Sequence, residues 1–132
     1  MSIHAAIRYD DPNAAVDWLC GAFGFTADEV FHDDQGVVQH AVLSFGAGET
    51  GTGKVMVSGP RDPGWLGGAA AAPLASTISL YLVVGDPVAH HDHAVAEGAT
   101  VVRGPEHTGY GSHEYSARDP EGNLWSFGTY RP

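Results

Sequence analysis

An internal repeat is the feature of this sequence that most limits the folds it can adopt. The pair Asp11-Pro12 recurs as Asp86-Pro87, and Gly24 recurs as Gly98 at nearly the same offset. Each Asp-Pro pair lies between a strand-like segment and a helix-like segment, and each glycine precedes a short strand-like segment. The full order, strand, Asp-Pro, helix, glycine and strand, predicts two copies of one βαβββ unit.

The first copy shows how the elements are recognised. Asp11 can cap a helix, and Pro12 suits its first turn, where an amide would lack a partner in any case. Apolar residues then recur with helical spacing at Ala15, Trp18, Leu19, Ala22 and Phe23. Strands are predicted at residues 3–9, 26–32, 37–45 and 54–58 in the first copy, and at 77–84, 100–103, 112–118 and 124–129 in the second.

These elements predict one α+β domain over residues 1–132. The first module covers about residues 1–59, a linker about 60–76, and the second module about 77–132. One helix covers only one face of a small sheet, and two modules, from one chain or from a dimer, can enclose the other face. We expect paired half-barrel sheets around a cup, two outer helices, and a homodimer.

The charge balance excludes several classes of function. Sixteen acidic residues against six Lys and Arg give a net charge of −10, which disfavours binding to nucleic acid and to anionic membranes. The acidic surface favours cationic small molecules, although solubility alone would explain it. No apolar run or N-terminal signal pattern is evident, and the lone Cys20 fits a packed apolar side chain better than a nucleophile. These features predict a cytoplasmic protein.

Three motifs carry a resemblance to a known family. They are Tyr9-Asp10-Asp11, Ala22-Phe23-Gly24-Phe25, and the turn Asp119-Pro120-Glu121-Gly122-Asn123. With the repeat, they make the whole chain resemble the vicinal oxygen chelate superfamily, which includes glyoxalase I, extradiol dioxygenases, and fosfomycin- and bleomycin-resistance proteins. Residues 110–130 look most like its small uncharacterised glyoxalase/bleomycin-resistance subgroup. Members do unrelated chemistry on this fold, so function must be argued from the site.

The resemblance implies metal ligands on the first and last strands of each module. His4 occupies the first of these positions and is a competent ligand. The other three positions fall on residues that are not usual ligands: Met56 or Ser58, Ser79 or Ile78, and Ser126. A catalytic divalent metal needs about three protein ligands, so we expect no metal and no other cofactor. An alternative site could still combine His4, His40 and Glu114.

Other candidate motifs favour structural interpretations. The helix residues His90, His91 and His93 are predicted to form a solvated face, with only His91 near the apolar line of Val88 and Val95, although His90 and His93 could share an ion.

The glycine-rich segment 46–54 lacks the Ser or Thr and the following helix of a phosphate-binding loop. The serines lack the strand–turn–helix setting of a nucleophile and fit a polar lining. Trp125 and Phe127 should pack under the second helix.

Aromatic residues in glycine-rich loops complete the predicted site. Trp65 and Tyr110 are expected at the mouth of the cup, where rings can stack on a flat ligand, although local loop packing would also account for them. The sequence predicts a protein that binds or sequesters a small planar or cationic molecule, such as an antibiotic, in the manner of bleomycin-resistance proteins. The alternatives are a metal-dependent glyoxalase-type lyase, isomerase or dioxygenase, and metal-free acid–base catalysis. The predicted ligand-binding residues are His4, His40, Met56, Ser58, Trp65, Tyr81, Tyr110, Glu114, Ser116 and Ser126.

Overall fold

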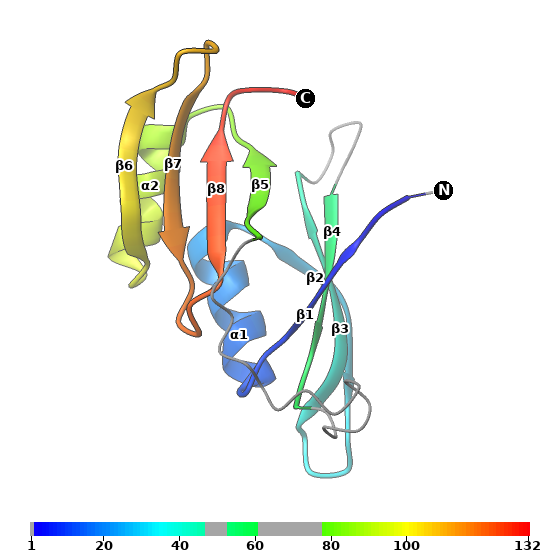
Figure 1. Ribbon diagram of the computed structural model, residues 1–132. Coiled ribbons are helices and arrows are strands. Elements are labelled where there is room, and N and C mark those ends of the chain that lie inside the picture. The colour runs from blue at the N-terminus through cyan, green and yellow to red at the C-terminus, as the bar shows by residue number, and fades with distance from the viewer. Residues whose placement is uncertain (1, 47–52, 61–77) are drawn as a thin grey trace. The chain divides into compact units, whose positions relative to one another are not determined.

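The repeat predicted from the sequence appears as two modules with the same order of elements (Figure 1). The computed structural model describes residues 2–46, 53–60 and 78–132, and the chain divides into compact units at Met1–Pro73 and Leu74–Pro132. Each unit contains a strand, a helical segment and three further strands. The α+β class and the two βαβββ modules are therefore confirmed. The predicted linker, residues 60–76, lies outside the described residues except for Pro60.

The first module forms a four-stranded mixed sheet in the order β1-β4-β3-β2. β1 runs parallel to β4, and the other neighbouring pairs are antiparallel. Its elements are β1 (Ala5–Arg8), α1 (Pro12–Trp18), the π-helical turn η1 (Leu19–Phe23), β2 (Thr26–His32), β3 (Val38–Phe45) and β4 (Gly53–Ser58). The strand bounds match the predicted ones to within one residue, except that β1 begins two residues later and ends one residue earlier than predicted.

The first helix begins and ends where the sequence indicates. The Asp11 carboxylate accepts a hydrogen bond from the backbone amide of Ala14 at 3.0 Å and so caps the start of the helix. Gly24 ends the helical segment in the left-handed conformation, with φ 87°. The predicted apolar stripe is buried at Ala15, Leu19, Ala22 and Phe23. The sequence did not predict the π-helical turn, which is a rare conformation that usually occurs as a single turn within a helix.

The second module repeats this topology in the order β5-β8-β7-β6. Its elements are β5 (Leu80–Val83), α2 (Pro87–Ala96), β6 (Thr100–His107), β7 (His113–Arg118) and β8 (Leu124–Gly128). The predicted end of β6 at Arg103 is wrong, since the strand continues to His107. The register between β6 and β7 shifts on either side of Arg103, and such irregularities let a strand pass through Gly104 and Pro105 without ending.

Helix α2 packs on the sheet through a different face from the one predicted. Pro87 and Ala94 are buried, and the ring of His90 lies 4.3 Å from that of Phe127. His90 and His91 also contact Tyr115, whereas Val88 and Val95 are exposed. The residues of α2 that face the sheet are therefore at positions 87, 90, 91 and 94. The prediction that His91 is the one histidine near the side that packs on the sheet is wrong.

The core of the second module lies between α2 and its sheet. The predicted burial of Trp125 and Phe127 is confirmed, since both are fully buried, together with Tyr115 and Ala117 on β7. No helix in the described part of the chain is long and apolar enough to cross a membrane.

Candidate functional site

In the first module, four predicted site residues lie on or beside the face of the sheet that points away from the buried strand residues. His40 pairs with Ser58, and Met56 pairs with both Val42 and Ala6. Their neighbours on the opposite face, Ala41, Leu43, Val55 and Val57, are buried. His4 lies just before β1 and is exposed, with its Nε2 2.7 Å from the Ser2 hydroxyl. The alternation of side chains along strands accounts for this arrangement.

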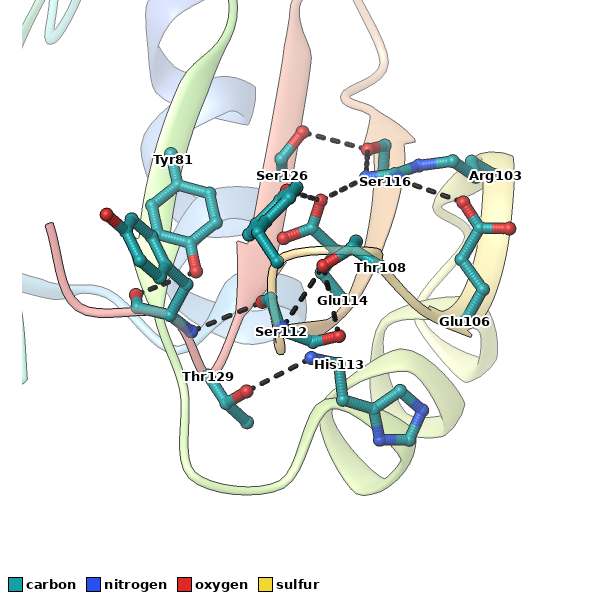
Figure 2. Close-up of polar contacts among 12 residues, drawn as sticks. Tyr81, Arg103, Glu106, Thr108, Ser112, His113, Glu114, Ser116, Ser126 and Thr129 are labelled. Carbon is teal, nitrogen blue, oxygen red and sulfur yellow. Dashed lines mark hydrogen bonds and ion pairs between the residues drawn. The ribbon is translucent and has the colours of Figure 1, made fainter.

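In the second module, three predicted residues form a row across β5, β8 and β7. Tyr81 pairs with Ser126, and Ser126 pairs with Ser116. Figure 2 shows the two serine hydroxyls pointing toward each other, with their oxygens 2.8 Å apart. The Tyr81 hydroxyl donates a hydrogen bond to the carbonyl of Tyr130 at 2.8 Å. This row lies on the sheet face opposite Trp125 and Phe127.

Glu114 lies on the same face as this row, two residues before Ser116 on β7. Its residue surface is only 4% exposed. Oε1 accepts a hydrogen bond from Nη2 of Arg103 at 2.8 Å (Figure 2). It also accepts one from the hydroxyl of Tyr110 at 2.7 Å. Oε2 is buried and has no hydrogen-bond partner among the described residues. Burying a carboxylate oxygen without a hydrogen bond lowers the stability of the fold, so this atom is a feature that needs a physical explanation.

Gly128 makes the close packing around Glu114 possible. It pairs with Glu114 across β7 and β8. A Cβ at this position would lie 2.7 Å from both the Glu114 Cβ and the Tyr81 hydroxyl, and 3.0 Å from the Ser112 hydroxyl. Real Cβ atoms do not approach neighbours this closely, so only glycine fits here without rearrangement. Gly128 was not among the residues predicted from the sequence, although a glycine inside a strand is a known signal of close approach.

The charges around Glu114 keep it ionised. Burial acts to raise its pKa, but the hydrogen bonds from Arg103 and Tyr110, with a smaller effect of the nearby Ser112 hydroxyl, outweigh burial, and the pKa is lowered. The hydrogen bond to Glu114 in turn raises the pKa of Tyr110, so its hydroxyl stays protonated and acts as the donor.

Arg103 also contacts a second carboxylate. Its Nη1 lies 2.9 Å from Oε1 of Glu106, which is about half exposed. The Arg103 guanidinium therefore forms ion pairs with two carboxylates, and the three groups together carry one net negative charge. Arg103 was missed by the sequence analysis, because its position beside Glu114 depends on the irregular register of β6.

The predicted residues thus gather in two groups, one on each module. His4, His40, Met56 and Ser58 belong to the first module, whereas Tyr81, Tyr110, Glu114, Ser116 and Ser126 belong to the second. Trp65 lies outside the described residues. That the two groups line one cup stays a prediction.

The described residues of either module contain no group of three His, Cys, Asp or Glu side chains that could hold a metal ion. The alternative metal site of His4, His40 and Glu114 draws on both modules, and it stays a prediction. At the family's last-strand position, Ser126 offers a hydroxyl that is hydrogen-bonded to Ser116. The absence of a metal or other cofactor likewise stays a prediction.

Comparisons with known proteins agree on the fold. TioX from Micromonospora sp. ML1 is 29% identical, with 100% of this chain and 98% of TioX covered and a TM-score of 0.72. A glyoxalase/bleomycin resistance protein/dioxygenase family enzyme from Burkholderia phytofirmans PsJN is 18% identical, with 95% and 94% covered and a TM-score of 0.73. A glyoxalase-related enzyme from Fulvimarina pelagi is 15% identical, with 97% and 88% covered and a TM-score of 0.70.

A search of curated proteins finds no significant match. The model of the Glyoxalase/Bleomycin resistance protein/Dioxygenase superfamily, in contrast, matches residues 2–127. The chain therefore belongs to the glyoxalase/bleomycin resistance protein/dioxygenase superfamily.

Proposed function

We propose that this protein binds and sequesters a small planar molecule, such as an antibiotic, without a catalytic metal. The observation that carries the proposal is the polar face of the second sheet, where Tyr81, Glu114, Ser116 and Ser126 share one side. A few fixed polar groups beside aromatic rings are typical of small-molecule sites. We call these four residues, together with Tyr110, the binding face.

Aromatic rings at the edge of the binding face support a flat ligand. Tyr110 is 61% exposed, and its ring lies 5.6 Å from that of Tyr130 in an edge-to-face arrangement. Exposed tyrosine rings provide a large apolar surface with few rotatable bonds, so they stack on a ligand at a small cost in entropy.

The chemistry of the binding face favours binding over catalysis. The hydroxyls of Ser116 and Ser126 bond to each other, and a serine nucleophile instead needs an adjacent base. The lowered pKa of Glu114 makes it a weak general base near neutral pH. These groups are suited to hold and orient a molecule.

A second candidate function is a metal-dependent lyase, isomerase or dioxygenase of the glyoxalase type. It is favoured by His4 and His40, because two imidazoles in the first module could begin a metal site that Glu114 would complete. It requires a site built from both modules.

Metal analysis and ligand binding together distinguish the two functions. Protein purified without a histidine tag should contain far less than one equivalent of Zn, Ni or Fe, and its tryptophan fluorescence should be quenched by acridine, a planar heteroaromatic probe. Stoichiometric metal would overturn the proposal. Metal-free, folded protein that binds the probe would argue against a metal enzyme.

A further inference from the structure

The Glu114 carboxylate uses only half of its capacity to accept hydrogen bonds. Its side chain is 6% exposed, and Oε1 takes both the Arg103 and the Tyr110 hydrogen bonds. Oε2 is buried without a partner in the described part of the chain. An ionised carboxylate can accept about four hydrogen bonds, so the group has capacity for a further donor.

The two donors to Glu114 differ in how firmly they are held. Arg103 comes from strand β6 and is also held by Glu106 at 2.9 Å. Tyr110 belongs to the turn between β6 and β7, lies between Gly109 and Gly111, and is 61% exposed. Its ring can therefore leave Glu114 at the cost of one hydrogen bond and its contact with Tyr130. Moving Tyr110 would uncover the carboxylate while Arg103 stays in place.

We propose that Tyr110 is a displaceable cap on Glu114, and that the ligand presents a protonated amine or amidine to this carboxylate in place of the Tyr110 hydroxyl. The inference rests on the proposed function, because it names the chemical class that the binding face takes.

The local charge supports a cation over an anion. Arg103, Glu106 and Glu114 carry one net negative charge, so a monocation neutralises the cluster, whereas an anion would have to compete with both carboxylates for Arg103. A charged N–H donor also makes a stronger hydrogen bond to a carboxylate than a neutral hydroxyl does.

Three acridines of similar size test this charge preference. At neutral pH and about 0.15 M salt, which screens long-range attraction, 9-aminoacridine is a cation, acridine is neutral and acridine-9-carboxylate is an anion. Fluorescence titration of the wild-type protein should give an affinity for 9-aminoacridine on the order of tenfold higher than for acridine. Acridine-9-carboxylate should bind most weakly.

Two variants separate the buried carboxylate from general charge. Glu114→Gln should lower the affinity for 9-aminoacridine by roughly tenfold or more and leave the affinity for acridine nearly unchanged. Glu106→Gln is the matched control, because it removes the same charge from the same arginine, at an exposed residue outside the binding face. It should change the affinity for 9-aminoacridine by less than about threefold.

A third variant tests the cap and does not depend on the folding of Glu114→Gln. Tyr110→Phe keeps the ring and removes the competing hydroxyl, so it should raise the affinity for 9-aminoacridine by about threefold or more. If the hydroxyl only supports the structure, the same variant should weaken the binding of 9-aminoacridine and acridine alike, which would overturn the cap.

The outcomes distinguish this inference from the proposed function. If the wild-type protein binds none of the three acridines, both fail. The proposed function survives and only this inference is overturned in three cases. These are equal affinity of the wild-type protein for the three acridines, a preference for the anion, or an equal loss of affinity for 9-aminoacridine in Glu114→Gln and Glu106→Gln. Near-ultraviolet circular dichroism of each variant shows whether a loss of binding reflects a loss of folding.

Discussion

Gly128 is a residue whose side chain cannot be enlarged without moving its neighbours. Gly128→Ala would place a Cβ 2.7 Å from the Glu114 Cβ and the Tyr81 hydroxyl, so strand β7 or β8 must shift. We expect the free energy of unfolding to fall by about 1–3 kcal/mol, as is usual for an overpacked site. Denaturant unfolding measures this. Gly85→Ala is the control, since a Cβ there meets nothing within 4 Å, and equal effects of the two changes would contradict the argument.

Glu114 should contribute to the acid sensitivity of the protein. Its pKa is lowered in the folded state, so its stabilising contribution is fully present above the pKa of an unfolded glutamate, about 4.3. That contribution is lost as the pH falls below this value through the lower folded pKa. Glu114→Gln removes the titrating group, so its stability should depend less on pH in this range.

Unfolding experiments between pH 7 and pH 3 would test this prediction. At neutral pH, Glu114→Gln should be less stable than the wild type by about 1–3 kcal/mol, because a hydrogen-bonded charge is lost. Parallel pH profiles for the two proteins would show that Glu114 is not the group responsible.

At the level of the elements, one carboxylate organises the turn between β7 and β8. Oδ1 of Asp119 accepts hydrogen bonds from the backbone amides of Glu121 and Asn123, each at 3.0 Å. Oδ2 accepts a hydrogen bond from Nε1 of the buried Trp125 at 3.0 Å. Asp119→Ala would leave these donors without that partner. It should lower the free energy of unfolding by about 2–4 kcal/mol.

Thermal or denaturant unfolding of Asp119→Ala measures the effect of this turn. Asp34→Ala is a suitable control, because Asp34 is an exposed residue in the turn between β2 and β3 and surface substitutions of this kind change stability by less than about 0.5 kcal/mol. A loss of similar size in both variants would mean that the Asp119 hydrogen bonds are unimportant.

Most elements could be predicted from the sequence because their signals are local. The Asp-Pro pairs and the glycines Gly24 and Gly98 set the starts and ends of the helical segments, and the alternation of side chains set the strands. The end of β6 and the inward face of α2 were predicted wrongly. The strand passes through Gly104 and Pro105, residues that usually interrupt a strand, and the helix packs through two histidines, which do not mark an apolar stripe.

In the candidate site, the residues placed by the alternation of side chains along a strand were predictable, and those placed by pairing between strands were not. Alternation along β5, β7 and β8 places Tyr81, Glu114, Ser116 and Ser126 on one face, as expected from the sequence. The roles of Arg103 and Gly128 depend on pairing between strands. A shift of register between Val101 and Arg103 brings Arg103 opposite Ser116, and no local pattern in the sequence signals such a shift.

At the scale of the whole molecule, the sequence predicts a homodimer. Each helix covers one face of its own sheet, and a second module, from the same chain or from a second copy, can enclose the other face. Sedimentation equilibrium should give a mass near twice the 13.8 kDa of one chain. A mass of one chain at all accessible concentrations would contradict the prediction, and the binding face would then have to be completed within a single chain.

Membership of the superfamily establishes the fold of the chain and leaves open whether it binds or converts its ligand. The polar groups of the second module favour the proposed binding function: a buried, ionised carboxylate and two serines hydrogen-bonded to each other lie beside an exposed tyrosine. These groups are suited to recognition, and the lowered pKa of Glu114 makes this carboxylate a weak base at neutral pH.

A nuclear magnetic resonance titration of metal-depleted protein with 9-aminoacridine tests this central claim most directly. Saturable shifts in the backbone amide signals of Tyr81, Tyr110, Glu114, Ser116 and Ser126, with the probe recovered unchanged, are the predicted result. Shifts confined to residues outside the binding face, or binding that appears only after a divalent metal is added, would contradict it.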